Sequence, residues 1–423
     1  MKQTFPSVLL ACLLVTSGAR LLSAQTTPEA YRMLDDVRAL SADELGGRLI
    51  GTPGADSAAR YLAHRFQAAG LQAGPAGWFQ EFQVAADAPA AVHARLGAAT
   101  GRNVIGVLPG SDPNLRNEVV ILGAHYDHLG PGGFGSLDPD STGVVHNGAD
   151  DNASGAAALI HIAGRLSAAP PRRTVVFIAF GGEELGLLGS QYYVEHPPYP
   201  LDHTVAMVNM DMIGRLRNRR LIVYGTGTAR EFPAMLDSLN WYAGFELHQL
   251  PDGYGPSDHS AFYARSRPVL HVFTDLHEDY HRTTDDWNLI NADGLVRVAD
   301  FTASVVRALG DRTAPLTFVN LPAPRPVASD SASSSGYGAY LGSIPDMTGN
   351  PGGVRITGVR AESPADRAGL TGGDVITRIG DMDIPDLQAM ANALRKHQSG
   401  DVVAIVFTRD GREHSVDVTL GSR

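Results

Sequence analysis

The side chains best suited to chemistry in this chain are His, Asp and Glu residues that follow predicted strands. Five segments carry them, namely GAHYDH, GADDNASG, GGEELG, NMDMIG and HEDYHRTTDDW. Buried acids are costly unless they are paired or bind a metal, so this many acidic strand ends are hard to explain by chance. Imidazoles with several carboxylates and no thiolate are the donors expected around Zn²⁺ in a hydrolytic site.

One of these segments, TVVFIAFGGEELGLLGSQYYV at 174–194, joins a predicted strand to two adjacent carboxylates. The apolar run 174–180 is typical of a strand buried on both faces, and the glycines after it allow a sharp turn. Glu183 and Glu184 then point to opposite sides, so one could bind a metal while the other acts as a base. Alone, such a pair is more often a solvated acidic turn before a helix, but the other strand ends favour the chemical interpretation.

The elements that must position these residues alternate between strands and helices. We expect strands over 79–84, 92–96, 103–108, 118–122, 174–180, 204–210, 220–224 and 268–273, and helices over 28–45, 55–69, 155–166, 231–239 and 292–309. This alternation predicts a three-layer α/β fold, in which a mostly parallel sheet has helices on both faces. Ligands bind at the carboxyl ends of strands in such sheets, which is where the acidic segments fall.

Length and composition limit the classes of protein. A chain of 423 residues is long enough for two or three domains, and its formal charge of −11 argues against a nucleic-acid partner. Cys12 is the single cysteine and lies in the N-terminal segment. We therefore expect no cysteine nucleophile, thiolate zinc site or disulfide in the mature protein.

The N-terminus has the pattern of an export signal. Lys2 precedes an apolar core at 8–15, and small residues follow up to Ala24, our first choice of cleavage site ahead of Ala19. The core is too short to span a bilayer, so we expect no transmembrane span and a periplasmic or extracellular location. A lipoprotein anchor at Cys12 is a minor alternative, because few apolar residues precede it.

Composition changes after residue 310 and divides the chain. Residues 311–338 carry several prolines and a Ser/Ala run, as linkers do. Beyond them we expect strands over 354–359, 375–379, 402–408 and 414–420 and a helix over 387–397. The expected organisation is a signal peptide at 1–24, a catalytic domain at 25–310, a linker at 311–338 and a small β-rich domain at 339–423.

Six motifs, HYDH, GADDNASG, GGEELGLLGS, NMDMIG, GPSDHSAF and YHRTTDD, occur in an order and spacing that resemble the co-catalytic di-zinc aminopeptidase family. That family includes bacterial leucyl-type aminopeptidases, aminopeptidase Y and the glutamate carboxypeptidases. The resemblance covers roughly residues 40–309 and implies a zinc-exopeptidase fold that acts on peptides.

By motif, the resemblance implies two Zn²⁺ per chain. The implied ligands are His125 and Asp211 for one zinc, Glu184 and His281 for the other, and Asp151 as the bridging carboxylate. The neighbouring Asp150 is out of register with the motif. In this family the peptide bond after the bridging ligand is often cis, so we expect a cis Asp151–Asn152 bond.

The resemblance also implies roles around the metals. Glu183 corresponds to the general base that takes a proton from the metal-activated water. Asp127 corresponds to the acid that orients the His125 imidazole. Tyr280 corresponds to a hydrogen-bond donor for the oxyanion, although a packed aromatic side chain is the simpler explanation. The pair Asp258-His259 stays unassigned, because local structure explains it equally well.

The segment VRAESPADRAGLTGGDVITRIGDMDI at 359–384 resembles a PDZ domain of bacterial proteases. Such domains add a peptide strand to a sheet edge, so the resemblance implies a peptide or protein C-terminus as a partner. The loop YLGS at 340–343 takes the place of the loop that caps a peptide carboxylate, but Ser343 departs from the usual Gly-Leu-Gly-Phe pattern. A domain that only packs on the catalytic one or aids folding is the alternative.

The main prediction is an aminopeptidase that removes N-terminal residues from peptides, and other interpretations stay open beside it. A carboxypeptidase or dipeptidase would have the same metal set, whereas His125 and Asp211 together disfavour a single-zinc cyclase. A catalytically inactive chain that binds peptides through its PDZ domain is a further alternative, although the ligands and the base are present. The stretch between Phe82 and Asn103 is too short for the large domain some relatives insert, which predicts an open active site.

Overall fold

The structure is a computed structural model. It describes residues 1, 27–88, 91–92, 94–133, 135–138, 141, 143–255, 257–321, 339–345, 352–359, 363–385 and 387–421. The expected export signal with Cys12, and the linker beyond residue 321, lie outside the described residues. Among the described helices, none combines the length and the apolar content that crossing a bilayer would require.

The larger body is built on a mixed sheet. In the described residues it has nine strands in the order β1-β3-β5-β4-β6-β9-β7-β8, with β2 paired to β3. Their bounds are β1 Gln72–Ala73, β2 Phe79–Val84, β3 Ala99–Leu108, β4 Val119–His125, β5 Thr174–Phe180, β6 Thr204–Met210, β7 Arg220–Tyr224, β8 Glu246–Gln249 and β9 Val269–Phe273. The central strands β5, β4, β6 and β9 are parallel, and β3 and β7 flank them antiparallel. The carboxyl ends of these four central strands therefore meet at one edge.

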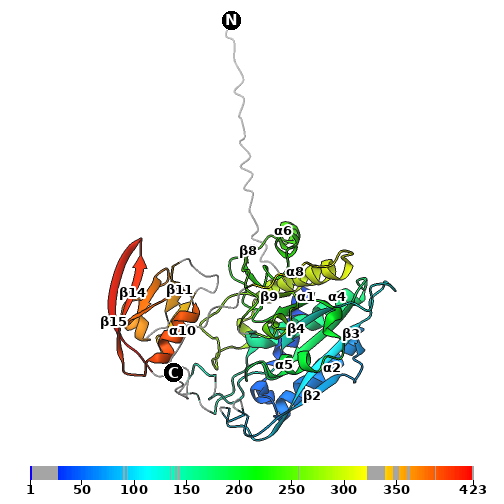
Figure 1. The fold of residues 1–423 in the computed structure, drawn as a ribbon, viewed down its shortest axis with the longest axis horizontal. Helices are drawn as coiled ribbons and strands as arrows, with labels where there is room; N and C mark the ends of the chain where they lie inside the picture. The colour runs from blue at the N-terminus through cyan, green and yellow to red at the C-terminus, as the bar shows by residue number, and fades with distance from the viewer. Residues whose placement is uncertain are drawn as a thin grey trace.

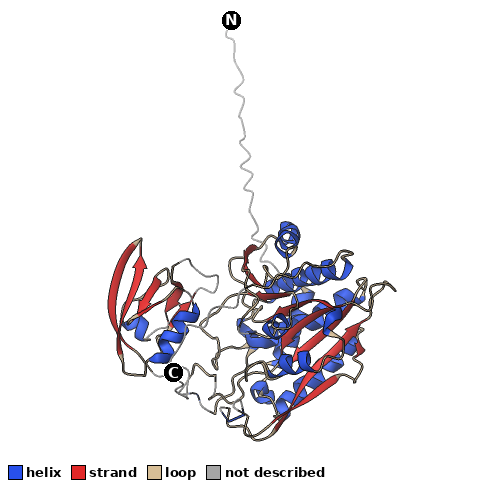
Figure 2. Ribbon diagram, in the orientation of Figure 1, coloured by secondary structure: helices blue, strands red, loops and turns tan. Residues whose placement is uncertain are grey.

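Helices cover both faces of the sheet, which gives three layers (Figures 1 and 2). One face of the sheet carries α2, α4 and α8. On this layer α1 packs against α4 and α8, and α6 packs against α8. The other face carries α5 and α7. Their bounds are α1 Pro28–Leu40, α2 Pro53–Ala68, α4 Gly155–Ser167, α5 Leu188–Glu195, α6 Phe232–Ala243, α7 His259–Tyr263 and α8 Ala292–Asp311. The expected α/β fold with helices on both faces is confirmed.

The two faces arise from the strand period of two residues. Along β4, Val120 and Leu122 belong to the core under α1, α2, α4 and α8. Their neighbours Val119 and Ile121 belong to the core under α5 and α7. Strand β5 repeats this alternation, and every residue in it is buried, as its apolar composition predicts. The parallel centre of the sheet is thus fixed from both sides.

Some local expectations differ from the structure. The predicted strand at 92–96 is wrong, because residue 92 is helical and residues 94–95 form a turn. Its apolar residues Val92, Ala94 and Leu96 alternate with polar ones as in a strand, but Val92 faces solvent, so the alternation does not mark a buried face. The helix predicted over 28–45 ends at Leu40, and a separate 3₁₀ turn follows at Asp43–Arg48. The short elements β1, β8 and α7 carry too weak a pattern to be predicted.

The C-terminal part forms its own sheet and core. Its strands are β10 Ser343–Pro345, β11 Val354–Val359, β12 Val375–Ile379, β13 Met382–Asp383, β14 Val402–Arg409 and β15 Arg412–Thr419, and its helices are α9 Pro364–Arg367 and α10 Leu387–Lys396. The predicted strands and helix of this segment are all present, within one to a few residues at their ends. In its core region the Asp374 carboxylate, 1% exposed, accepts hydrogen bonds from Nε and Nη2 of Arg409, both at 2.6 Å.

Candidate metal centre

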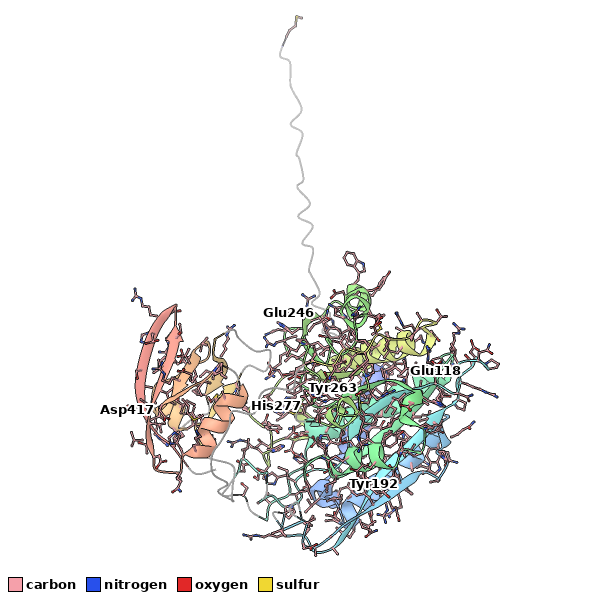
Figure 3. All side chains as sticks on the ribbon, in the orientation of Figure 1. Glu118, Tyr192, Glu246, Tyr263, His277 and Asp417 are labelled. Atoms are coloured by element: carbon pink, nitrogen blue, oxygen red, sulfur yellow. The ribbon has the colours of Figure 1, made fainter. Side chains whose placement is uncertain are left out.

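The residues expected to bind metal gather at the carboxyl edge of the four parallel strands. His125 is the last residue of β4, Glu184 follows β5 across the glycine turn, and Asp211 follows β6 directly. Asp151 lies in the turn before α4, and His281 lies in the loop after β9. Figure 3 labels His277 in that same loop, on the side of the domain away from Glu118, which precedes β4. The fold brings all five predicted ligands together.

Asp151 stands between two sets of donors. Its Oδ1 lies 3.2 Å from Nε2 of His125, which is also 3.3 Å from Oδ1 of Asp211. Its Oδ2 lies 3.2 Å from Nε2 of His281, which is also 3.1 Å from Oε2 of Glu184. Ligands about 2.0–2.1 Å from one zinc at tetrahedral angles are about 3.3–3.4 Å apart. The donor set therefore fits two zinc ions that share Asp151.

The electrostatics of these groups follow from their mutual contacts. Burial would raise the pKa of Glu184, but His281 and His128 outweigh it and lower the pKa to about 2. Burial likewise opposes ionisation of Asp151, yet hydrogen bonds from His125 and His281 hold its pKa well below the ordinary value. Both carboxylates are therefore ionised at neutral pH, as metal ligands must be.

Glu183 lies beside the ligands and differs from them electrostatically. It is buried, and it shares with His125 and Asp211 a cluster in which the donor atoms lie within 4.8 Å of one another. Burial, and then the charges of Asp211 and Glu184, raise its pKa well above the ordinary value of a glutamate. A raised pKa makes this carboxylate a stronger base than an ordinary glutamate, which suits a proton acceptor beside the expected metal ligands.

Asp127 contacts this group differently from the expected arrangement. Nδ1 of His125 lies 3.2 Å from the backbone carbonyl of Asp127 and 3.8 Å from its Oδ1. The carboxylate oxygen Oδ1 instead accepts the backbone N–H of Glu183 at 3.1 Å. The backbone carbonyl of Asp127 therefore orients the His125 imidazole. The Asp127 side chain links the end of β4 to the turn of Glu183 by a hydrogen bond.

Tyr280 and the chain around His281 form one side of the centre. The Tyr280 ring stacks on the His281 imidazole with ring centroids 3.9 Å apart. Burial, followed by the charges of Asp151 and Glu184, raises the pKa of Tyr280 well above its ordinary value, so it keeps its proton. Nδ1 of His281 lies 2.8 Å from the carbonyl of Gly135, which leaves Nε2 to face the carboxylates.

The turn that carries Asp151 is also held by hydrogen bonds that do not involve the expected metal ligands. The Asp151–Asn152 peptide bond is cis, as expected. Asp150 points away from the ligands: its Oδ1 accepts the N–H of Gly214 at 2.6 Å and its Oδ2 lies 3.1 Å from Nε2 of His277. The carboxylate of Asp285 accepts the backbone N–H groups of both Asp150 and Asp151. Asp150 is thus structural, in agreement with its register in the motif.

Two residues near the centre were given no role from the sequence. His128 is fully buried, and its Nδ1 lies 2.6 Å from Oε1 of Glu184. Arg48 is also fully buried, and its guanidinium donates hydrogen bonds to the carbonyls of Tyr126 and Gly148. The motif HYDH contains His128 and could have revealed it. Arg48 lies far from the other motifs in the sequence, so no pattern linked it to them. Asp258 and His259 are buried nearby without an assigned role.

The sequence and the fold were compared with known proteins. Residues 103–306 match the profile of peptidase family M28, and residues 339–420 match that of the PDZ domain. The leupeptin-inactivating enzyme 1 of Streptomyces exfoliatus is 28% identical over 305 residues, which cover 66% of this chain and 61% of the relative. Aminopeptidase YwaD of Bacillus subtilis is 30% identical over 230 residues, which cover 52% of this chain and 47% of the relative. The chain thus spans about half to three fifths of these relatives' length.

Solved structures support the fold. The zinc aminopeptidase BSAP from Bacillus subtilis superposes with a TM-score of 0.54 at 18% identity, over 68% of this chain and 97% of that structure. At this identity the superposition establishes the architecture, and the chemistry has to be argued from the side chains described above.

Proposed function

Since the chain carries a peptidase family M28 domain followed by a PDZ domain, we propose that it is a zinc-dependent aminopeptidase that removes N-terminal residues from peptides. The observation that carries the proposal is the position of Asp151, whose two oxygens face the donor pairs His125/Asp211 and His281/Glu184. Names of the relatives add support, because YwaD is called an aminopeptidase.

The proposed mechanism assigns a role to each group. Two zinc ions held by these residues would acidify a shared water and polarise the scissile carbonyl. The Glu183 carboxylate accepts the proton of the attacking water and delivers it to the nitrogen of the leaving amine. The Tyr280 hydroxyl keeps its proton and donates a hydrogen bond to the developing oxyanion. Backbone contacts at Asp127 and Gly135 hold the two ligand imidazoles in the orientation that this requires.

An apolar cluster beside the centre supports peptides with an apolar N-terminal residue as substrates. Met212 directly follows the ligand Asp211 and packs with Ile222 and Phe273. The partly exposed side chains of Tyr224, Leu250, Leu276 and Tyr280 line the same cluster. Partly exposed apolar side chains beside the proposed metal donors would favour an aliphatic or aromatic side chain next to the scissile bond.

The remaining parts of the chain are assigned on sequence grounds. The N-terminal signal pattern supports export to the periplasm or the extracellular space, with the mature chain beginning after residue 24. The PDZ domain supports binding of a peptide or protein C-terminus at its sheet edge. Both assignments can be tested independently of the peptidase.

The test is to purify the mature chain, measure its zinc content and assay a panel of peptides with free or N-acetylated amino termini. We expect close to two zinc per chain and release of free apolar amino acids from unblocked peptides only. Hydrolysis of acetylated but not free peptides would instead overturn the exopeptidase assignment. A chain that binds zinc but cleaves neither set would contradict the proposal.

A further inference from the structure

Arg48 occupies an unusual position for a cationic side chain. It ends the 3₁₀ turn Asp43–Arg48 with a positive φ of 51°, after two glycines that also have positive φ. A Cβ on Gly47 would lie 2.6 Å from the carbonyl oxygens of Gly130 and His146, so no other residue fits there without a shift of the backbone. This turn therefore passes directly against the loop between β4 and the Asp151 turn, and carries Arg48 into the interior.

The guanidinium of Arg48 bridges several segments of backbone. Nε donates to the carbonyl of Tyr126 at 2.6 Å, and Nη1 donates to the carbonyls of Leu40 at 2.6 Å and Asn147 at 2.7 Å. Nη2 donates to the carbonyl of Gly148 at 2.9 Å. The guanidinium group is a planar fork whose N–H groups have fixed directions, so these hydrogen bonds hold the contacted backbone segments at set distances from one another.

Two of these segments carry metal ligands. Tyr126 directly follows the ligand His125 at the end of β4, and Gly148 precedes the bridging ligand Asp151 by three residues. A single buried side chain therefore connects the two turns on which His125 and Asp151 stand. His125 and Asp151 must keep their 3.2 Å separation to share a metal, and among the described residues no strand pairing links their turns directly.

Among the described residues, no carboxylate forms an ion pair with Arg48. In the part of the chain that the structure describes, its recorded hydrogen bonds all go to carbonyl oxygens. Burial lowers the pKa of Arg48 to about 10, while the charges of Asp127 and Asp151 oppose the shift, so the group is a cation at neutral pH. Burying an arginine in this way is costly, and a side chain needed only for core filling would be apolar.

We propose that Arg48 is a positioning residue of the zinc centre, whose guanidinium fork sets the distance between the His125 turn and the Asp151 turn. The inference rests on the proposed metallopeptidase function. It assigns to Arg48 a geometric role, in which the shape of the fork matters as well as its charge. Removal of a nearby positive charge alone would strengthen the binding of a dication. Weaker zinc binding after loss of Arg48 therefore reports lost positioning.

Arg173 provides a matched control. It is 2% exposed, and it donates to Oε2 of Glu118 at 2.7 Å and to the carbonyl of Leu309 at 3.2 Å. It therefore has a buried guanidinium bound partly to main chain, like Arg48. It lies just before β5, at the amino end of the parallel strands and opposite the metal edge. Glu118, its partner, is labelled on that side of the domain in Figure 3.

The experiment compares Arg48→Lys and Arg48→Met with Arg173→Lys and Arg173→Met in the full chain. Zinc affinity is measured by competition with a chromophoric chelator, and folding by circular dichroism and thermal unfolding. We expect both Arg48 variants to bind zinc about 10- to 100-fold more weakly than wild type, since an ammonium group cannot span the same carbonyls. The Arg173 variants should unfold at lower temperature and keep zinc affinity within about twofold of wild type.

Each outcome bears on one of the two proposals. If Arg48→Lys binds zinc as wild type does, charge suffices and the positioning role is overturned; this variant also carries the test if Arg48→Met does not fold. Equal losses of zinc affinity in the Arg48 and Arg173 variants would likewise overturn it, because general destabilisation would then explain both. If wild-type protein binds no zinc, the proposed function itself fails, whatever the variants do.

Discussion

The imidazole of His128 faces the carboxylate of Glu184, with 2.6 Å between Nδ1 and Oε1. The other carboxylate oxygen, Oε2, faces His281 at 3.1 Å. Glu184 is thus held between a ligand histidine and a second, fully buried histidine. In the proposed zinc site, His128 would orient the carboxylate so that one oxygen is directed to the metal, which is how residues behind metal ligands raise affinity.

Replacement of His128 by Ala should weaken the zinc position formed by Glu184 and His281. We expect zinc affinity at that position to fall about 10- to 100-fold, so that one of the two ions is lost first during chelator titration. His161→Ala is the control, since His161 pairs with Asp300 at 2.9 Å between helices away from the centre. Unchanged stoichiometry and affinity in His128→Ala would contradict the orienting role.

The two adjacent glutamates should separate in their effects. Glu183→Gln keeps the shape of the side chain and removes the proton acceptor, so turnover should fall about 10²- to 10⁴-fold while both zinc ions stay bound. Glu184→Gln removes a charged ligand and should lose a zinc ion. Turnover and metal content of each variant are measured in parallel. Near wild-type turnover in Glu183→Gln would exclude it as the base.

Tyr280→Phe tests the hydrogen bond to the oxyanion. The ring that stacks on His281 stays, so the fold and the zinc content should be preserved. Loss of the hydroxyl should lower kcat about 10- to 100-fold with a smaller change in KM, because the oxyanion develops only in the transition state. Tyr193→Phe is the control, as Tyr193 lies fully buried in the core under α5. If both variants keep kcat, Tyr280 is only a packed aromatic residue.

Asp374 gives the PDZ domain a stability that depends on pH. Burial would raise its pKa, but the hydrogen bonds from Arg409 and from the Thr371 N–H outweigh this and lower it. A lowered folded-state pKa contributes stability that is present above the unfolded value of about 3.9 and is lost as the pH falls through the folded value. Asp374→Asn should therefore cost about 1–2 kcal/mol at pH 7 and less below about pH 4.

The measurement for Asp374→Asn is a urea titration in which amide exchange of β14 and β15 peptides is followed by mass spectrometry, at pH 7 and near pH 3.5. Asp383→Asn is the control, because Asp383 pairs with Arg378 on the exposed surface and should contribute little. A loss of stability in Asp374→Asn that is the same at both pH values would show that the ion pair is not its source.

Sequence patterns were most informative where a residue's neighbours along the chain determine its surroundings. Glu183 and Glu184 could be placed because a buried strand and a glycine turn precede them, and Asp211 because it directly follows β6. His128 and Arg48 depend on contacts between segments far apart in sequence, such as Arg48 with Gly148. Those contacts leave no periodic signal. For the same reason the antiparallel pairing of β7 with β9 could not be read from the strand pattern.

The parallel order β5-β4-β6-β9 also has a consequence for assembly of the molecule. Its metal donors are spread from residue 125 to residue 281, so a growing or partly folded chain offers zinc no complete binding set. Zinc bound at the proposed site would then stabilise only those molecules in which the four strands have paired. Availability of the ion would select correctly assembled protein and leave incomplete chains open to proteolysis.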